Sequence, residues 1–309
     1  MSNQKKVMVL LACRNGAAWV REQLDSILAQ QGVDVSLLIQ DDKSTDETAS
    51  VIALYAAQHP GQIGIFLNEK GTGSAGANFR KLIARAELSN FDYVALADQD
   101  DIWNVDKLVR SIAAIQTTGA YGYSAAVNAF WPDGKERILA QSPQPRALDF
   151  IFEGAGQGCT FVLPQSVFNG VQEFCRQYAE ELVDFHFHDW LIYILIRTHG
   201  GSWYFDPEPA MRYRQHANND MGARGGVAGI RRRIAMVKEG WYGRQVAIAL
   251  KIFRLAGGDD ARATTLEVAL QAKPSGSRRL ELACLAYHHG RRRLSDRFAL
   301  VIFALLGWL

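Results

Sequence analysis

The chain has few of the features that stabilise small secreted proteins. Its 309 residues include only four cysteines (Cys13, Cys159, Cys175 and Cys284), which are far apart and form no Cys-x-x-Cys pair. This spacing argues against a disulfide framework or a zinc site and fits a reducing cytosol. The sequence also has no Asn-x-Ser/Thr acceptor for N-glycosylation.

Long hydrophobic runs are also missing. The apolar stretch over 7–12 is too short for the core of a signal peptide, and its residues are needed for a strand. The apolar stretch over 298–309 is well under the roughly 20 residues that cross a bilayer. We therefore expect a cytoplasmic protein, with a peripheral position on the inner face of the cytoplasmic membrane as a further expectation.

Charge is distributed unevenly along the chain. Residues 1–220 carry 18 Lys or Arg and 26 Asp or Glu, whereas residues 221–309 carry 16 and 6. A glycine-rich stretch over 222–229 separates the two parts and has the composition of a hinge. The sequence therefore predicts one domain over 1–220 and a basic, helical C-terminal region over 221–309.

The basic region has three arginine clusters next to apolar helical stretches. The clusters are Arg231–Arg233, Arg278–Arg279 and Arg291–Arg293. Such clusters beside apolar faces fit the surface of an anionic membrane. A solvated helical appendage or a dimer interface is the alternative. Nucleic acid is not an expected partner, because no recognised binding module is present.

The first part of the chain alternates strands and helices. An unbroken apolar run over 7–12 predicts a strand buried on both faces, and further strands are expected over 36–40, 63–67 and 93–97. Helical spacing predicts a helix over 17–30, and further helices are expected over 46–58, 75–86 and 106–117. Repeated βα units indicate a parallel sheet with right-handed crossovers. Ligands of such sheets bind beyond the carboxyl ends of the strands.

The regular alternation stops near residue 120. Further strands are expected over 123–130, 160–163, 202–205 and 210–214, with helices over 164–180 and 188–199. A glycine-rich stretch over 154–158 lies between them. The fold class is therefore α/β, with a helical C-terminal appendage.

Three acids directly follow the apolar run over 93–97. Side chains alternate along a strand, so Asp98 and Asp100 are expected on one side and Asp101 on the other. Two carboxylates on one side repel each other unless a cation lies between them, and their oxygens suit Mg²⁺ or Mn²⁺ bound together with phosphate. The alternative is an N-cap cluster for the helix over 106–117.

A second acidic turn follows the strand over 36–40. Asp41 and Asp42 end this strand, and Asp46 or Thr45 fits the cap of the next helix. Asp42 could accept the N–H of a pyrimidine base, with a plain turn as the alternative. The repetition of this arrangement on two strands favours one nucleotide crevice.

These motifs resemble the family-2 inverting glycosyltransferases over roughly residues 5–220. The resemblance rests on the runs over 9–15, 24–30, 41–46 and 98–101, in this order and spacing. It implies a GT-A fold, which is a Rossmann-like mixed sheet flanked by helices, together with a nucleotide-diphosphate sugar donor and Mg²⁺ or Mn²⁺. The motifs over 101–103, 188–190 and 213–216, with Asn219, look more narrowly like bacterial L-rhamnosyltransferases, which implies dTDP-L-rhamnose as donor and a polysaccharide or lipid-linked glycan as acceptor.

The same resemblance implies roles for individual residues. Asp42 would face the base and Asp98 the ribose, while Asp100 would bind the metal together with Asp98 and His216. Asp189 would be the catalytic base, and His216 would contact the diphosphate or the metal. Two further donor contacts, Asn15 and Asn78, match positions of the family motifs, although Ala77 stands where the family usually has Arg.

General chemistry supports a base and a donor-rich group at these positions. Transfer with inversion needs a base for the acceptor hydroxyl and neutralisation of the departing diphosphate. Asp189 begins a helix, whose positive end favours an ionised carboxylate; an ordinary N-cap is the alternative. His216 has Arg212, Arg214 and Asn218 as neighbours, a set that fits diphosphate, whereas a lone histidine is more often structural.

One motif favours a different class of enzyme. Residues 71–76 spell Gly-x-Gly-x-x-Gly between a strand and a helix, which is the dinucleotide fingerprint of oxidoreductases. It follows the third strand and not the first, and no acid ends a strand at the right offset, so the motif alone is weak evidence. An oxidoreductase is kept as an alternative. The residues are also compatible with a transferase using a UDP-hexose donor, a nucleotidyltransferase and a catalytically silent scaffold.

Overall fold

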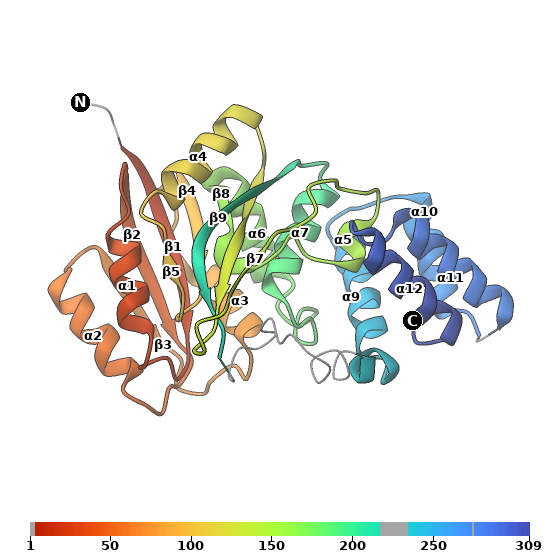
Figure 1. The fold of residues 1–309 in the computed structure, drawn as a ribbon, viewed down its shortest axis with the longest axis horizontal. Coiled ribbons are helices and arrows are strands. Elements are labelled where there is room, and N and C mark those ends of the chain that lie inside the picture. Colours follow the sequence, from red (N-terminus) through yellow and green to blue (C-terminus); the bar gives the residue numbers. More distant parts are fainter. Residues whose placement is uncertain (1–3, 217–233, 274) are drawn as a thin grey trace. The chain divides into compact units, whose positions relative to one another are not determined.

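The computed structural model describes residues 4–216, 234–273 and 275–309. Contacts divide the chain into two compact units (Figure 1). The first comprises the described residues up to Gln141, Ala155–Asp189 and residues 201–216; the second comprises Ser142–Gly154, Trp190–Gly200 and the described residues from 234 on. The predicted boundary at 220/221, the hinge over 222–229, Asn218, Asn219 and Arg231–Arg233 lie outside the described residues. The two-part division therefore stays a prediction.

The first unit contains the strands and most of the helices that were expected from the apolar pattern. Its strands are β1 (Lys5–Cys13), β2 (Val33–Asp41), β3 (Ile63–Leu67), β4 (Tyr93–Ala97), β5 (Ile102–Trp103), β6 (Gly122–Phe130), β7 (Glu136–Leu139), β8 (Val162–Pro164) and β9 (Trp203–Arg214). Its helices are α1 (Val20–Leu28), α2 (Thr48–Gln58), α3 (Ala75–Arg85), α4 (Lys107–Thr118), the 3₁₀ turn η1 (Gly158–Thr160) and α6 (Gln165–Gln177). Helix α7 (His188–Thr198) begins in the first unit and continues in the second.

The strands form one mixed sheet in the order β3-β2-β1-β4-β8-β6-β9-β5, with β7 paired to β6. The first four strands in this order are parallel, and β8 runs antiparallel to β4 and β6. Cys13 pairs with Asp41, and Leu11 pairs with Ala97. The turns after β1, β2 and β4 therefore emerge together at the carboxyl edge, on both sides of the point where the strand order reverses, which is where open α/β sheets bind ligands.

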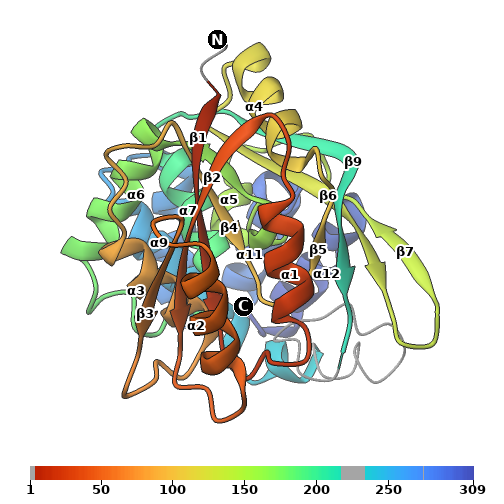
Figure 2. The same ribbon diagram turned by 90° about the vertical axis from the view of Figure 1, so that its left-hand side faces the viewer.

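Both faces of the parallel strands are covered by helices. Val7, Val9 and Leu11 of β1 belong to the hydrophobic core that α1, α2 and α4 complete on one face. Helices α3 and α6 pack on the opposite face of the sheet. Figure 2 shows them on the other side of the strands from α1. Burial on both faces explains the unbroken apolar runs of β1 and β4, whereas β2 and the edge strand β3 are partly exposed.

The second half of the sheet departs from the predicted elements. The separate strands expected over 202–205 and 210–214 are wrong, because β9 is one strand that pairs with β6 throughout. Asp206 pairs with Ala125 and Pro209 with Ala126, so two residues bulge out between them. Proline has no N–H for the ladder, and a bulge accommodates it without ending the strand. The short elements β5 and β7 were not predicted.

The second unit is helical in its described residues. Its helices are α5 (Asp149–Phe152), α9 (Trp241–Leu255), α10 (Ala261–Gln271), α11 (Gly276–His289) and α12 (Leu294–Leu306), together with most of α7. None of the helices that the structure describes is sufficiently long and apolar to cross a membrane.

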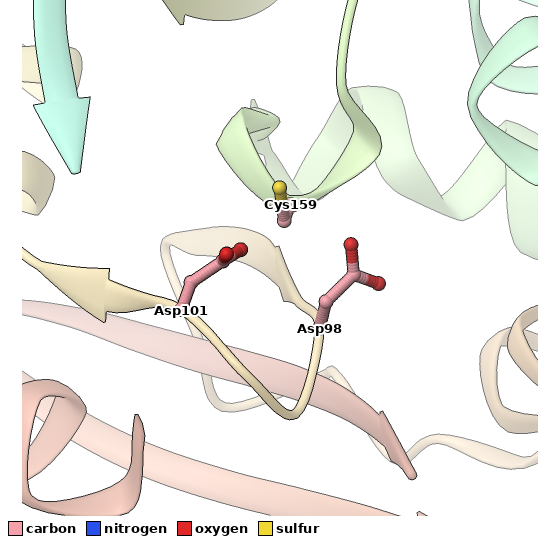
Figure 3. Close-up of side chains that lie close together, drawn as sticks. All are labelled: Asp98, Asp101 and Cys159. Atoms are coloured by element: carbon pink, nitrogen blue, oxygen red, sulfur yellow. The ribbon is translucent and has the colours of Figure 1, made fainter. Parts of the chain in front are cut away.

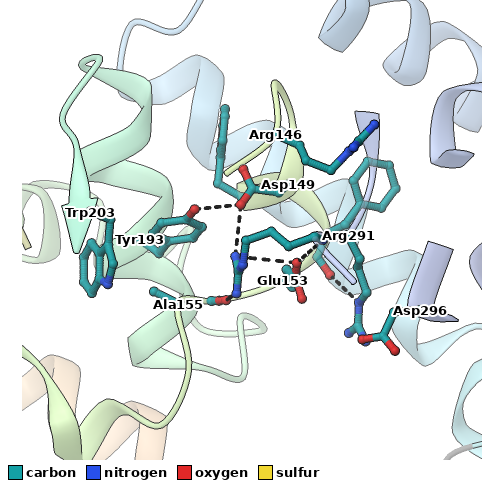
Figure 4. Close-up of polar contacts among 12 residues, drawn as sticks. Arg146, Asp149, Glu153, Ala155, Tyr193, Trp203, Arg291 and Asp296 are labelled. Carbon is teal, nitrogen blue, oxygen red and sulfur yellow. Dashed lines mark hydrogen bonds and ion pairs between the residues drawn. The ribbon is translucent and has the colours of Figure 1, made fainter. Parts of the chain in front are cut away.

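A buried charge cluster lies in the second unit (Figure 4). The Asp149 carboxylate accepts hydrogen bonds from Arg292 Nη1 at 3.0 Å, from Arg197 Nη1 at 3.0 Å and from the Tyr193 hydroxyl at 2.7 Å. Glu153 adds a second acid, 3.5 Å from Arg292. The cluster joins α5, α7 and the turn before α12 by charge-assisted hydrogen bonds.

This cluster corrects one expectation about the basic region. Arg291–Arg293 was expected to face an anionic surface, but the Arg292 side chain is only 1% exposed and is neutralised by Asp149. Arg291 also has an acidic partner, Asp296, at 3.7 Å. Positive charge counted in the sequence therefore overstates the charge at the surface of this unit.

Candidate active site

The turn after β1 is bonded to the turn after β2. The Asn15 side-chain oxygen accepts the backbone N–H of Thr45 at 2.8 Å, and the Asn15 N–H donates to Ser44 Oγ at 2.8 Å. Asn15 has φ of 50°, a left-handed conformation that Asn tolerates better than most residues. The predicted donor contact Asn15 thus lies at the carboxyl edge and organises the two turns.

The turn after β4 joins the same arrangement through Gln99. Its side-chain amide accepts the Arg14 N–H at 2.7 Å and donates to the Arg14 carbonyl at 3.0 Å. A Cβ on Gly16 would lie 2.5 Å from Gln99 Oε1, so only glycine leaves room for this amide. Neither Gln99 nor Gly16 was singled out in the sequence, because an amide between two acids carries no signal of its own.

Asp42 holds the glycine-rich loop that follows β3. Its carboxylate is 1% exposed and accepts hydrogen bonds from Asn68 Nδ2 at 3.1 Å, the Thr72 N–H at 2.7 Å and Thr72 Oγ1 at 2.8 Å. Gly71 and Gly73 have φ of 65° and 86°, which explains the glycines in this loop. The role of Asp42 at the base stays a prediction.

Asn78 is buried on the inner side of that loop. Its side-chain oxygen accepts a hydrogen bond from Gln40 Nε2 at 2.8 Å, and its amide donates to the Cys13 carbonyl at 3.4 Å. Asn78 therefore connects α3 to the ends of β1 and β2. Its direct contact with a donor stays a prediction.

Asp98 and Asp101 lie together in the turn after β4, facing Cys159 of η1 (Figure 3). One ligand atom of each of these three residues lies within 4.8 Å of the others. The expectation that Asp101 points away from Asp98 is wrong, because β4 ends at Ala97 and the alternation of a strand ends with it. Burial raises the pKa of Asp101 well above its usual value, and the charges of Asp100 and Asp98 raise it further.

Lys107 lies buried behind these acids. Its Nζ donates to the Cys159 carbonyl at 2.9 Å and lies 3.1 Å from the centroid of the Trp103 ring. Burial lowers the pKa of Lys107 to about 7, against the opposing effect of the Asp101 and Asp98 charges. Lys107 was not singled out in the sequence because nothing in the residues around it shows that its side chain is buried.

Asp100 is paired with His216 from the end of β9. Asp100 Oδ2 and His216 Nε2 are 2.6 Å apart, and both side chains are largely buried. The Trp19 ring stacks on the imidazole with a centroid distance of 4.0 Å and an interplanar angle of 8°. Arg214 Nε donates to the Asp100 carbonyl at 2.9 Å, which fixes the end of β9 against the turn. The structure thus brings together two of the residues that were predicted to bind metal.

The Asp100–His216 pair suits a divalent cation better than the cluster around Cys159. A carboxylate oxygen and an imidazole nitrogen from separate elements are ligands that Mn²⁺ accepts, and the oxygen suits Mg²⁺. Burial raises the pKa of the Cys159 thiol, and the Asp101 and Asp98 charges raise it further, so the thiol stays protonated. A protonated thiol is a poor ligand for a hard cation.

Asp189 lies in the first turn of α7, beside η1. A Cβ on Gly158 would lie 2.6 Å from His188 Nε2 and 3.1 Å from Asp189 Cβ, so this glycine leaves room for both residues. The His188 ring stacks on Phe79 with a centroid distance of 3.8 Å. Since Cys159 follows Gly158, η1 has the predicted base on one side and the Asp98–Asp101 turn on the other.

The sequence matches the model of glycosyl transferase family 2 over residues 8–235. A dTDP-rhamnosyl transferase of Shigella flexneri is 36% identical over 236 residues, which cover 76% of this chain and 82% of that protein. An uncharacterized glycosyltransferase of a Nostoc species is 31% identical over 138 residues, covering 44% of this chain and 40% of that one.

Solved structures share the fold at low sequence identity. TarS of S. aureus in complex with UDP-GlcNAc has a TM-score of 0.57 at 13% identity, covering 98% of this chain and 90% of that chain. A mannosyltransferase of Pyrobaculum calidifontis in complex with GDP-Man and Mn²⁺ has a TM-score of 0.52 at 15% identity, covering 99% and 87%. The predicted GT-A fold with a helical C-terminal part is confirmed. The oxidoreductase alternative has no support from these relatives.

Proposed function

Because the chain belongs to glycosyl transferase family 2, we propose that it transfers L-rhamnose from dTDP-L-rhamnose, with inversion, onto a polysaccharide or lipid-linked glycan acceptor. The observation that carries this proposal is the Asp100–His216 pair, 2.6 Å apart at the edge where the turns after β1, β2 and β4 meet. The similarity to a dTDP-rhamnosyl transferase supports the choice of donor. A UDP-hexose donor with the same mechanism is the second candidate.

In this proposal Asp189 acts as the base. The acceptor hydroxyl attacks C1 of the sugar from the side opposite the nucleotide and gives its proton to the Asp189 carboxylate. The C1–O bond to the diphosphate breaks at the same time, so the configuration inverts and the diphosphate leaves with the bonding electrons. The N-terminal end of α7 favours the ionised carboxylate that this step needs.

The opposite end of the reaction needs charge neutralisation. Asp100 and His216 would hold Mg²⁺ or Mn²⁺, and the bound ion would stabilise the negative charge of the departing diphosphate. Asp98 is the third predicted ligand, but in the described part of the chain it groups with Asp101 and Cys159 and not with this pair. Asp98 would also contact the ribose. Trp19 keeps the His216 ring in place by stacking.

The remaining predicted contacts belong to the nucleotide side. Asp42 would accept the N–H of the base, and Asn15 and Asn78 would contribute from the turns around it. We propose a cytoplasmic location, peripheral on the inner face of the cytoplasmic membrane, because lipid-linked acceptors would be met there. The helical region after residue 220 would supply the membrane contact.

The decisive test separates donor binding from transfer. Asp189→Asn should bind dTDP-L-rhamnose as the native protein does, measured by isothermal titration calorimetry, and lose transfer by about 10³-fold or more, the upper range of what a positioned base contributes. Asp34→Asn removes an exposed carboxylate of β2 and serves as the matched control. An Asp189→Asn variant with native turnover would rule out the base. Tighter binding of UDP-hexoses than of dTDP-L-rhamnose would rule out the donor.

A further inference from the structure

An apolar stripe runs along the exposed side of α12. Leu294, Phe298, Ile302, Leu305 and Leu306 are each between 42% and 54% exposed. They recur every three or four residues, so they lie on one side of the helix. A surface helix normally has polar residues on its exposed side, and a contiguous apolar patch marks an interaction surface.

The stripe continues onto α11 and is flanked by arginines. The exposed Tyr287 ring lies 5.9 Å from the Phe298 ring, centroid to centroid, which joins the two helices into one patch. The Arg297 guanidinium lies 5.7 Å from the Tyr287 ring. Arg279 lies at the other end of α12, with Nη1 3.4 Å from the Leu305 carbonyl. Apolar side chains thus occupy the middle of this surface, with an arginine near each end.

The charge of this surface distinguishes among its potential occupants. Apart from Arg291 and Arg292, whose acidic partners Asp296 and Asp149 lie in the same unit, residues 276–309 contain four arginines and one further acid, Glu281. In a symmetric dimer this surface would meet its own copy, so arginines of one subunit would face arginines of the other and repel them. An anionic bilayer offers both an apolar layer and negative charge. With 13 residues, α12 is about 20 Å long, too short for the roughly 30 Å core of a bilayer.

We propose that α12 and the adjoining side of α11 dock flat on the surface of a bilayer that contains anionic lipids. The apolar stripe enters the boundary between headgroups and acyl chains, and Arg279 and Arg297 contact lipid phosphates. This deepens the membrane contact named under the proposed function, on which it rests, by assigning the surface and the lipid class. Arg292 takes no part, because Asp149 neutralises it inside the unit.

The test is co-sedimentation of the full-length protein with vesicles, in the absence of any nucleotide sugar. Vesicles of phosphatidylcholine alone are compared with vesicles that contain 30% phosphatidylglycerol, about a third of the lipid, chosen to give a clearly anionic surface. The native protein should bind the anionic vesicles at least tenfold more tightly, and the preference should fall as salt is raised. Phe298→Ser with Ile302→Ser should weaken binding by roughly 100-fold, since two large side chains no longer enter the bilayer.

The matched control is Leu54→Ser, which removes an exposed leucine from α2 of the first unit and should bind as the native protein does. Circular dichroism verifies that each variant is folded. Equal binding to both vesicle types, or native binding by the double variant, would overturn the proposal. The proposal would also be overturned if light scattering showed that the native protein is a dimer and the double variant a monomer. Turnover of dTDP-L-rhamnose with a water-soluble acceptor is measured separately, so loss of membrane binding and loss of transferase activity are distinguishable.

Discussion

Gly158 gives the sharpest test of how the structure positions the predicted base. In Gly158→Ala the new Cβ would lie 2.6 Å from His188 Nε2, whereas ordinary contact begins at 3.4 Å, so the imidazole must move by about 0.8 Å. The distance to Asp189 Cβ would be 3.1 Å, which requires a further shift of about 0.3 Å. Stacking on Phe79 at 3.8 Å limits how His188 can retreat.

The displacement of His188 and Asp189 should lower the turnover rate and leave the affinity for the donor unchanged. A misplacement of about 1 Å at a reacting group costs on the order of 100-fold in rate. The reacting group, Asp189, has to shift by only about 0.3 Å, so we expect kcat of Gly158→Ala to fall by roughly three- to tenfold in a coupled assay for dTDP release. The Kd for dTDP-L-rhamnose should stay within about threefold, since a 1.4 kcal/mol change is tenfold.

Gly170→Ala is the control for the substitution itself. Gly170 lies within α6, and a Cβ there has no atom within 4 Å, so the variant should retain native kcat. Its stability should rise by roughly 0.5–1 kcal/mol, because alanine favours a helix interior. If Gly158→Ala also turned over at the native rate, the close approach of η1 to Asp189 would have no part in placing the base.

Three further variants test other contacts. Trp19→Ala should raise the Kd for Mn²⁺ in the presence of dTDP by roughly three- to tenfold in calorimetry, because a stacked ring pair contributes about 0.5–1.5 kcal/mol. Trp19→Phe should restore most of the native affinity. An unchanged Kd in Trp19→Ala would show that stacking does not orient His216. Lys107→Met should flatten the pH dependence of stability between about pH 7 and 10. Burial lowers the pKa of Lys107 in the native protein to about 7, so the unfolded chain binds this proton more tightly. The free energy of unfolding therefore rises with pH in this window, by at most about 1.4 kcal/mol per pH unit. If urea denaturation gave the same change of this free energy with pH for both proteins, the prediction would be contradicted. Asp149→Asn should lower the free energy of unfolding by about 3–5 kcal/mol, because Arg292 stays buried without its main counter-charge; a loss below 1 kcal/mol would show that the cluster is not stabilising.

The first four strands were predictable because of their burial. The apolar runs of β1 and β4 are covered on both faces, so they are continuous in the sequence, whereas β2 and the edge strand β3 are partly exposed and show only short apolar stretches. The same reasoning fails at β9, where Pro207 and Pro209 suggest a break that a bulge accommodates. It also fails at β5, whose two residues are too few for any periodicity. The local sequence pattern thus predicts those strands whose formation depends on their own burial. Strands such as β5 and β9, which depend on pairing with a distant strand, are not predicted by it.

The site shows the same division. Acids at the ends of strands identify the carboxyl edge, since parallel strands must end together, and this holds for Asp42, Asp98 and Asp100. Trp19 could not be predicted, because the ring on which it stacks comes from the far end of the first unit's sequence. Gly158 gave a signal only as part of a glycine-rich stretch. Its function depends on the distance to α7, which no spacing in the sequence encodes.

The hydrogen bonds around Asp42 indicate how this edge would recognise a nucleotide. A carboxylate has about four lone-pair positions. Three protein donors, two of them from Thr72, already occupy the Asp42 oxygens and fix the orientation of the group. In the proposed role of Asp42, a single N–H of a pyrimidine base would take the remaining acceptor position. A carboxylate held by the protein in this way would lose no rotational freedom when the base binds, so the bonds to Thr72 and Asn68 would favour donor binding by preorganising the acceptor.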